Sequence, residues 1–432
     1  MPMEQLLHYV WKHKLFATAP LKTTEGVDVE VIDVGLHNNN AGADFFNAKV
    51  KLGDTLWVGN VEIHDMASQW FEHGHHNDPR YNNVVLHVVG KADMECLTQD
   101  GKQLPQMELA VPSGLAAHYG ELLAADKFPP CHHIIPQLQR LTLHSWLAAL
   151  QTERLESKTE AVVRRVEQAK GAWEDAFFIT LARNFGFGVN GDAFERWAAN
   201  VPLRCVDHHR DNAFQIEALF MGQAGLLNDT AIPTRHREAA TTDGYFGLLK
   251  KEYAYLAHKF NLQPLDPTLW LFLRLRPQNF PHIRLSQLAV LHHSRRASLA
   301  NIVACDNLTQ LRKALATQVS GYWQTHYVFG GESKASDKAL STASRDVLIL
   351  NTVVPVLFAY GRHRHNDALC DRAYQLLDEL KAEDNHIVRM WKACGLEVNN
   401  AGDTQALIQL KNEYCDRKNC LRCRIGYEYL RR

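Results

Sequence analysis

The sequence predicts an α+β protein, with a small N-terminal α/β domain followed by a larger all-α region. Between residues 27 and 89, apolar residues alternate with polar ones or form short runs, which is typical of strands. After about residue 115, apolar residues recur with the period of amphipathic helices. The chain has 432 residues, 46% of them hydrophobic, which is enough for two or three domains.

The N-terminal elements are expected in the order helix, three strands, helix, strand. The dipeptide Gly53-Asp54 predicts a hairpin between the second and third strands. The first helix is expected over 4–16, the strands over 27–36, 45–52, 55–63 and 83–89, and the short helix over 65–72. Residues 107–111 are expected to add a further strand. The helical region is expected to contain helices over 143–169, 172–184, 192–199, 214–227, 245–260, 285–300, 308–316, 367–380 and 404–413.

Three segments follow from this change of pattern. The α/β domain is expected over 1–115, a linker over 116–136 and the helical region over 137–432. Prolines 129, 130 and 136 predict the linker, because proline lacks the N–H that a helix interior requires.

Composition excludes several classes of protein. The net charge of −1 excludes a globally basic nucleic-acid coat, and the apolar fraction excludes a mostly disordered chain. No apolar run reaches the ~18 residues of a membrane span, so no membrane is expected as a partner. Nine cysteines without a signal-peptide pattern favour a reducing cytoplasm.

Three ionisable side chains are expected at one end of the N-terminal sheet. Asp44 begins one hairpin strand, and Glu62 and His64 end its partner. Strand alternation places Glu62 and His64 on one face. Two carboxylates form an oxygen-rich site that suits Mg²⁺ or Mn²⁺, and such an ion can activate water for attack on a phosphodiester. The alternative is a hydrogen-bonded polar patch that closes the sheet.

The register of the hairpin decides between these interpretations. With a two-residue turn, Asp44 pairs with Ile63 and faces away from Glu62. With a three-residue loop, or with a bulge near Ala43, Asp44 lies across from Glu62. The apolar pattern accepts both registers.

The arrangement resembles the PD-(D/E)xK nuclease superfamily, whose core has this order of elements. Asp44 matches the Asp that opens the second strand, and Glu62-Ile63-His64 matches the Glu-x-Lys motif, with His64 in place of lysine. Glu4 falls where some members place an extra acidic residue. The resemblance covers about the first quarter of the chain. It implies a restriction-endonuclease-like fold and a nuclease in which Asp44 and Glu62 hold the metal and His64 and Glu4 assist catalysis.

The whole chain also resembles an uncharacterised bacterial domain-of-unknown-function family. This resemblance implies no activity. It rests on residues 40–45 (NAGADF), 59–64 (GNVEIH), Tyr81 with 85–89 (VLHVV), and the C-terminal cysteines.

Histidines offer a second metal site. His73, His75 and His76 in a loop, with His87 on a strand, have donor atoms that bind Zn²⁺ in other proteins. We favour solvent-facing loop histidines and, for His87, a hydrogen-bonded histidine within the sheet. A hydrolase that uses the loop histidines is a third functional hypothesis.

The C-terminal segment contains a cysteine motif. Cys415, Cys420 and Cys423 have the spacing C-x4-C-x2-C among arginines and lysines that favour the charged thiolate. Such a group suits Zn²⁺ or an iron–sulfur cluster, and Cys394 is the expected fourth ligand. Three reduced thiols in a helical hairpin are the alternative.

An arginine-rich stretch is the expected contact for a phosphate backbone. Residues 267–305 contain no acidic side chain, and Arg274, Arg276 and Arg284 lie among aromatic residues. The sequence thus favours a Mg²⁺- or Mn²⁺-dependent phosphodiesterase acting on nucleic acid. The alternative is a non-catalytic scaffold that binds nucleic acid or protein through a degenerate nuclease-like fold.

Overall fold

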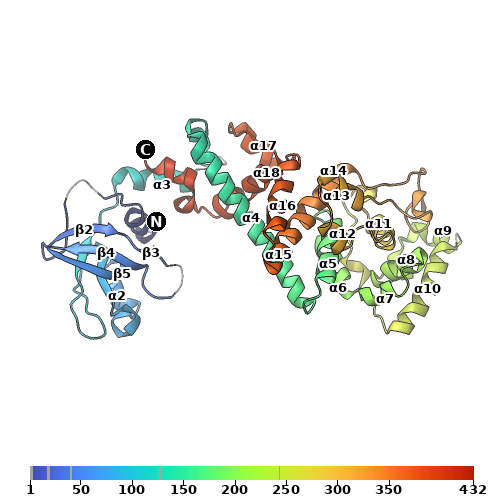
Figure 1. Cartoon of the computed structure of the whole chain (residues 1–432), viewed down its shortest axis with the longest axis horizontal. Helices are drawn as coiled ribbons and strands as arrows, with labels where there is room; N and C mark the ends of the chain where they lie inside the picture. Colours follow the sequence, from blue (N-terminus) through green and yellow to red (C-terminus); the bar gives the residue numbers. More distant parts are fainter. Residues whose placement is uncertain (1–2, 17–19, 39–40, 126–128, 243) are drawn as a thin grey trace. The chain divides into compact units, whose positions relative to one another are not determined.

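The computed structural model describes residues 3–16, 20–38, 41–125, 129–242 and 244–432, and Asn40 of the family motif lies outside them. The expected α+β class is confirmed, with an N-terminal sheet followed by a mostly helical region (Figure 1). The chain forms two compact units. Unit 1 comprises residues 1–146, 390–396 and 410–432, and unit 2 comprises 147–389 and 397–409.

Unit 1 is built on a mixed sheet. Its main strands follow one another along the chain in the expected order. Strand order is β1-β2-β4-β5-β6-β7, with β3 also pairing with β4. Strands β2, β4 and β5 are antiparallel, whereas β5, β6 and β7 are parallel. The strands are β1 (Leu21–Lys22), β2 (Asp28–Asp33), β3 (Leu36–His37), β4 (Phe45–Leu52), β5 (Thr55–Met66), β6 (Val84–Lys91) and β7 (Gln106–Glu108).

The helices of unit 1 complete its core. Helix α1 (Met3–Lys12) packs against β5 and β6 and buries Leu6, Leu7 and Val10. The short α2 (Gln69–Glu72) starts later than expected, because β5 continues to Met66. Trp70 of α2 is buried and donates from its indole nitrogen to the Leu97 carbonyl. Helices α3 (Ser113–Ala124) and α19 (Arg424–Leu430) also belong to this unit.

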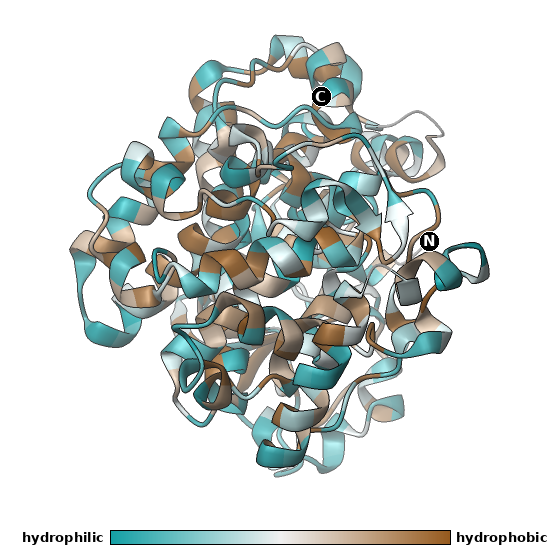
Figure 2. Cartoon of the chain, turned by 90° about the vertical axis from the view of Figure 1, so that its right-hand side faces the viewer, coloured by the Kyte–Doolittle hydropathy of each residue, from teal (hydrophilic) through white to brown (hydrophobic). Residues whose placement is uncertain are grey.

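Unit 2 is mostly helical around its own core. The expected all-α region also contains a small antiparallel sheet of β8 (His326–Val328) and β9 (Gly331–Glu332). Trp197, Phe194, Phe220 and Trp323 are among its fully buried side chains. In Figure 2, hydrophobic residues concentrate toward the middle of the view and hydrophilic ones in the outer turns. The helices from α4 to α18 are α4 (Arg140–Gln168), α5 (Trp173–Phe185), α6 (Gly191–Asn200), α7 (Leu203–Asp207), α8 (Ala213–Gln223), α9 (Arg237–Thr242), α10 (Tyr245–Phe260), α11 (Pro281–His293), α12 (Leu299–Val303), α13 (Leu308–Ala314), α14 (Thr342–Leu348), α15 (Val354–Arg364), α16 (Asp367–Glu379), α17 (His386–Ala393) and α18 (Ala401–Gln409).

The longest apolar helical run is part of this packing. Residues Thr342–Arg364 form 23 helical residues that would be long and apolar enough to cross a membrane. Of its most apolar window, 61% is buried inside the protein, which is typical of a core helix. The sequence analysis expected no apolar stretch of this length because it considered only uninterrupted apolar residues. This helix is apolar on average but contains several polar residues.

The division into segments differs from the expected one. The first part of the expected linker forms helix α3, since Pro112 directly precedes the helix and residues 113–124 contain no proline. The boundary between the units falls inside α4, and the cysteine-containing C-terminal segment clusters with unit 1. This grouping depends on contacts between segments that are far apart in the sequence. The apolar patterns along the chain are local and do not predict such contacts.

Candidate functional site

A β-bulge places Asp44 opposite Glu62. Leu52 pairs with Thr55 across a two-residue turn, and this register continues to Ala48 and Gly59. The register then shifts by one residue, so that Phe45 pairs with Val61. Asn47 lies in the shift with a φ of 55°, and its N–H donates to Asn60 Oδ1 at 3.3 Å. The tight turn and the facing carboxylates therefore occur together, and the bulge lies at Asn47 instead of the expected Ala43.

The two carboxylates accept hydrogen bonds from each other's strands. The Asp44 N–H donates to Glu62 Oε2 at 3.1 Å, and the Ile63 N–H donates to Asp44 Oδ2 at 2.9 Å. The Glu62 residue is only 4% exposed. Burial, followed by the charge of Asp44, raises the pKa of Glu62 to about 9. Burial also raises the pKa of Asp44, against His8 and the Ile63 hydrogen bond. A nearby cation would relieve this cost of burying two carboxylates.

His64 lies in a chain of imidazoles. Its Nδ1 is 2.9 Å from His87 Nε2, and its Nε2 is 3.1 Å from His73 Nδ1. His64 is 2% exposed, and burial, followed by the neighbouring His87, lowers its pKa to about 2. The His64 imidazole is therefore neutral at this end of the sheet.

The Gln106 side chain lies at the buried end of this chain. Its amide nitrogen donates to the Met94 carbonyl at 3.0 Å, which assigns the amide orientation. The same nitrogen lies 3.3 Å from Cys96 Sγ and 3.4 Å from His87 Nδ1, so two acceptors share its second proton. The tautomers of His87, His64 and His73 set the direction of the imidazole chain. The expectation of a hydrogen-bonded histidine at position 87 is confirmed, since this residue is fully buried and paired.

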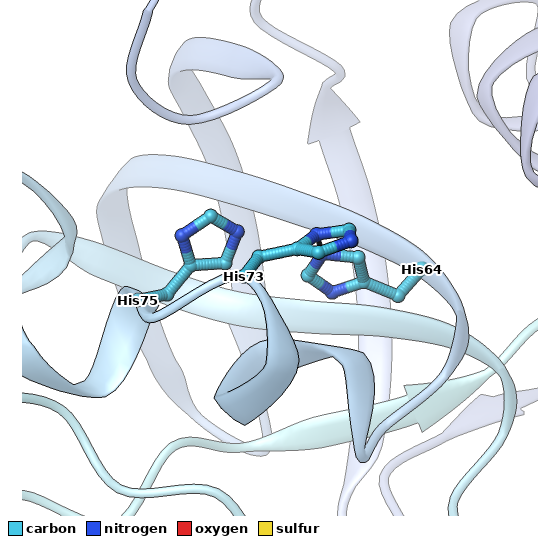
Figure 3. A group of neighbouring side chains, drawn as sticks. All are labelled: His64, His73 and His75. Carbon is cyan, nitrogen blue, oxygen red and sulfur yellow. Dashed lines mark hydrogen bonds between the residues drawn. The ribbon is translucent and has the colours of Figure 1, made fainter.

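The loop histidines are not all solvent-facing, contrary to expectation. The imidazole of His75 is buried, stacks on Tyr81 with ring centroids 3.9 Å apart, and places Nε2 3.2 Å from Glu62 Oε1. The same oxygen is 3.8 Å from His64 Nε2. Ligand atoms of His64, His73 and His75 all lie within 4.8 Å of one another (Figure 3). The loop folds back over the sheet because Trp70 and Tyr81 are buried on that face.

Helix α1 contributes two polar side chains to the same end of the sheet. His8 Nε2 lies 3.4 Å from Asp44 Oδ2. Burial raises the pKa of Glu4, with opposing effects from His8 and Asp44, which places this carboxyl in the electrostatic neighbourhood of the site. The sequence analysis missed His8. The i, i+4 spacing from Glu4 to His8 was the available signal, because it puts both side chains on one helix face.

The three arginines have different surroundings. Arg274 and Arg276 are exposed. Arg284 is 5% exposed, stacks on Phe187, and donates to Gln287 Oε1 at 2.7 Å and to Asn279 Oδ1 at 2.6 Å. The guanidinium of Arg284 is already hydrogen-bonded within unit 2, which argues against the expected phosphate contact at Arg284. For Arg274 and Arg276 the phosphate contact stays a prediction.

The C-terminal cysteines converge, with one change of partner. Cys415, Cys420 and Cys423 line a small cavity together with Cys131, which the sequence analysis did not select. Cys394 is partly buried and does not line this cavity.

Comparisons with known proteins identify the family without an activity. No curated protein and no solved structure matches the chain. The family model described as "Protein of unknown function (DUF2851)" matches residues 4–386, and its match spans the sheet, the histidine cluster and most of the helical unit. The chain therefore belongs to this family of unknown function.

Proposed function

We propose that the protein is a metal-dependent phosphodiesterase of the cytoplasm that acts on nucleic acid. The observation that carries the proposal is the meeting of Glu62 with His75 at 3.2 Å, beside Asp44, on a buried sheet end. Convergence of ionisable groups whose pKa values are strongly shifted is typical of functional sites. The nine free cysteines are compatible with a reducing compartment.

The donor set suits a divalent cation. Carboxylate oxygens favour Mg²⁺ or Mn²⁺, and the imidazole of His75 favours Mn²⁺ of the two. Asp44, Glu62 and His75 would hold the ion after their donor atoms move closer together. Among the described residues, the ligand atoms that already lie within 4.8 Å of one another are those of His64, His73 and His75. We leave His64 outside the ligand set, because both of its ring nitrogens already meet imidazoles, Nδ1 that of His87 and Nε2 that of His73. A bound ion would supply Lewis-acid stabilisation of a phosphodiester and a more acidic water.

The remaining side chains position the reacting groups. His64 is buried and orients His73, whose exposed ring is the member of the chain that a water or a phosphate can reach. Glu4 and His8 adjust the charge around Asp44. Exposed Arg274 and Arg276 provide guanidinium groups for a phosphate backbone.

A scaffold without catalysis is the second candidate. It is favoured by His64, which supplies an N–H donor but no positive charge at the lysine position of the nuclease motif. On this view the carboxylates only close the sheet through their backbone hydrogen bonds.

Cleavage assays separate the two functions. With Mn²⁺ or Mg²⁺, the wild type is expected to cut single- or double-stranded DNA or RNA, and Glu62→Gln is expected to lose at least about 100-fold in rate, because an ion ligand is removed at nearly constant volume. His75→Ala should weaken Mn²⁺ binding at least about tenfold.

Matched controls come from neighbouring residues. Glu72→Gln changes an exposed carboxylate on α2, and His76→Ala changes a histidine that packs on Phe71, so both should behave as wild type. Nucleic acid that is bound but left intact under all these conditions would refute the phosphodiesterase and support the scaffold.

A further inference from the structure

Four cysteines from two distant parts of the chain line one small cavity in unit 1. Cys131 follows α3, whereas Cys415, Cys420 and Cys423 belong to the C-terminal segment. The other lining residues are Leu122, Pro130, Tyr414 and Gly426, so the surroundings of the sulfur atoms are largely apolar. All four are free thiols, and Cys131 and Cys423 are buried.

The C-terminal segment is folded tightly around these sulfurs. A π-helical turn over Leu410–Cys415 ends at the first of its cysteines, and a 3-10 turn over Cys420–Arg422 leads to Cys423, which precedes α19. Asn419 holds the intervening loop by donating from its N–H to the Tyr414 carbonyl at 2.8 Å. A Cβ at Gly426 would lie 2.2 Å from the Cys420 carbonyl oxygen, so only glycine lets the two turns approach this closely.

The sulfur atoms are within electrostatic reach of one another. Burial, followed by the neighbouring Cys423 and Cys420, raises the pKa of Cys131 to about 12. Burial likewise raises the pKa of Cys415, with contributions from Cys423, Cys131 and Cys420. Without a cation, the closeness of the four thiols would not stabilise the folded protein. A metal centre would bind them as thiolates and so stabilise their arrangement.

Basic and backbone groups compensate negative charge at this place. Burial raises the pKa values of Cys420 and Cys423; Lys418 opposes the rise at Cys420, and backbone hydrogen bonds from Gly426 and Ile425 oppose it at Cys423. The last 22 residues hold seven lysines and arginines against three acidic residues. A cluster with four thiolate ligands carries net negative charge, which such surroundings stabilise.

The spacing of the sulfurs indicates which metal centre fits. Tetrahedral zinc, with Zn–S bonds of about 2.3 Å, brings its sulfurs to about 3.8 Å from one another. Among the described residues, three histidines meet within 4.8 Å, but no three of these cysteine sulfurs do. A four-iron cluster needs the wider arrangement, because its own iron and sulfide atoms stand between the ligands.

We infer that Cys131, Cys415, Cys420 and Cys423 bind a [4Fe–4S] cluster that fastens the C-terminal segment to the segment after α3. Cys131 takes the place expected for Cys394. In sequence, the whole of unit 2 lies between Cys131 and Cys415, so the cluster joins the chain segments that precede and follow that unit. Its role is structural.

Metal analysis of the full chain, purified without oxygen, tests the assignment. We expect about four iron and four acid-labile sulfide atoms per chain, a brown colour and bleaching in air. Stoichiometric zinc without iron would overturn the cluster in favour of a zinc site. A metal-free protein with unchanged thermal stability would overturn any metal site.

Serine variants test the ligand set. Cys131→Ser and Cys420→Ser should retain less than about one quarter of the iron, whereas Cys394→Ser and Cys205→Ser should retain all of it. Where a variant fails to fold, Mössbauer and electron paramagnetic resonance spectra of the wild type still report the cluster type. Full iron in Cys131→Ser together with loss in Cys394→Ser would show that the fourth ligand is Cys394.

Discussion

At the scale of single residues, burial decides which ionisable groups of this protein keep their charge. His64 and Glu62 occupy adjacent positions on one strand face, yet burial pushes their pKa values in opposite directions, to about 2 and about 9. Both shifts favour the neutral form. At neutral pH Glu62 is therefore protonated and His64 uncharged, and a cation that binds Glu62 has to displace its proton.

His282 in unit 2 allows this effect to be measured away from the candidate site. Its ring packs against Phe272, Trp323 and Phe329, and its Nδ1 has no hydrogen-bond partner among the described residues. Burial lowers its pKa from 6.5 to about 3. Between these values the unfolded chain binds a proton that the folded chain does not, so stability falls as the pH falls below 6.5.

We expect the melting temperature of the wild type to fall between pH 6.5 and pH 4, with His282 contributing up to about 1.4 kcal/mol per pH unit. His282→Met should flatten this dependence, because methionine does not titrate. Exposed His258, on α10, gives the control His258→Met. Equal slopes for the wild type and both variants would show that His282 titrates alike in the folded and unfolded states.

At the scale of elements, one irregular residue in β4 determines the geometry of the site. Asn47 is exposed and adopts a positive φ, which asparagine tolerates and β-branched residues do not. The bulge turns the start of β4 so that Asp44 faces Glu62. A regular hairpin with the same turn would direct Asp44 to the opposite face.

Asn47→Val is therefore expected to destabilise unit 1 by about 1–2 kcal/mol and to weaken Mn²⁺ binding. Asn47→Gly, which accepts the same φ, should preserve both properties. Denaturant unfolding and Mn²⁺ titration provide the two measurements. A valine variant with wild-type stability and metal affinity would disprove the dependence of the site on the bulge.

At the scale of the whole molecule, two compact units each bury their own core. Trp197 is a central residue of the second core, where it is fully buried and donates to the Phe220 carbonyl at 3.1 Å. Its ring meets Phe194 and Phe220 edge to face. The candidate metal site and the four cysteines all lie in unit 1.

Trp197→Ala should reduce the free energy of unfolding of unit 2 by about 3–5 kcal/mol, through lost contacts and a cavity. Mn²⁺ affinity and iron content should stay at wild-type values, because their ligands belong to unit 1. Calorimetry combined with metal analysis tests this. Loss of both metals in the folded variant would show that the units depend on each other.

The sequence by itself determined the fold class, the order of the main N-terminal elements along the chain and the shared face of Glu62 and His64. These features depend on periods of 2 and 3.6 residues, which are local properties of the backbone. The same locality explains the correct bounds of β4 and α10.

Only the tertiary structure decided the bulge at Asn47, the return of His75 to Glu62, the burial of Arg284 and the meeting of Cys131 with the C-terminal cysteines. Each of these depends on which distant surfaces pack together, and apolar patterns that accept two registers or two partners do not specify that choice. The sequence therefore predicted which types of residue form the candidate site. Which side chains contact one another there was decided by long-range packing.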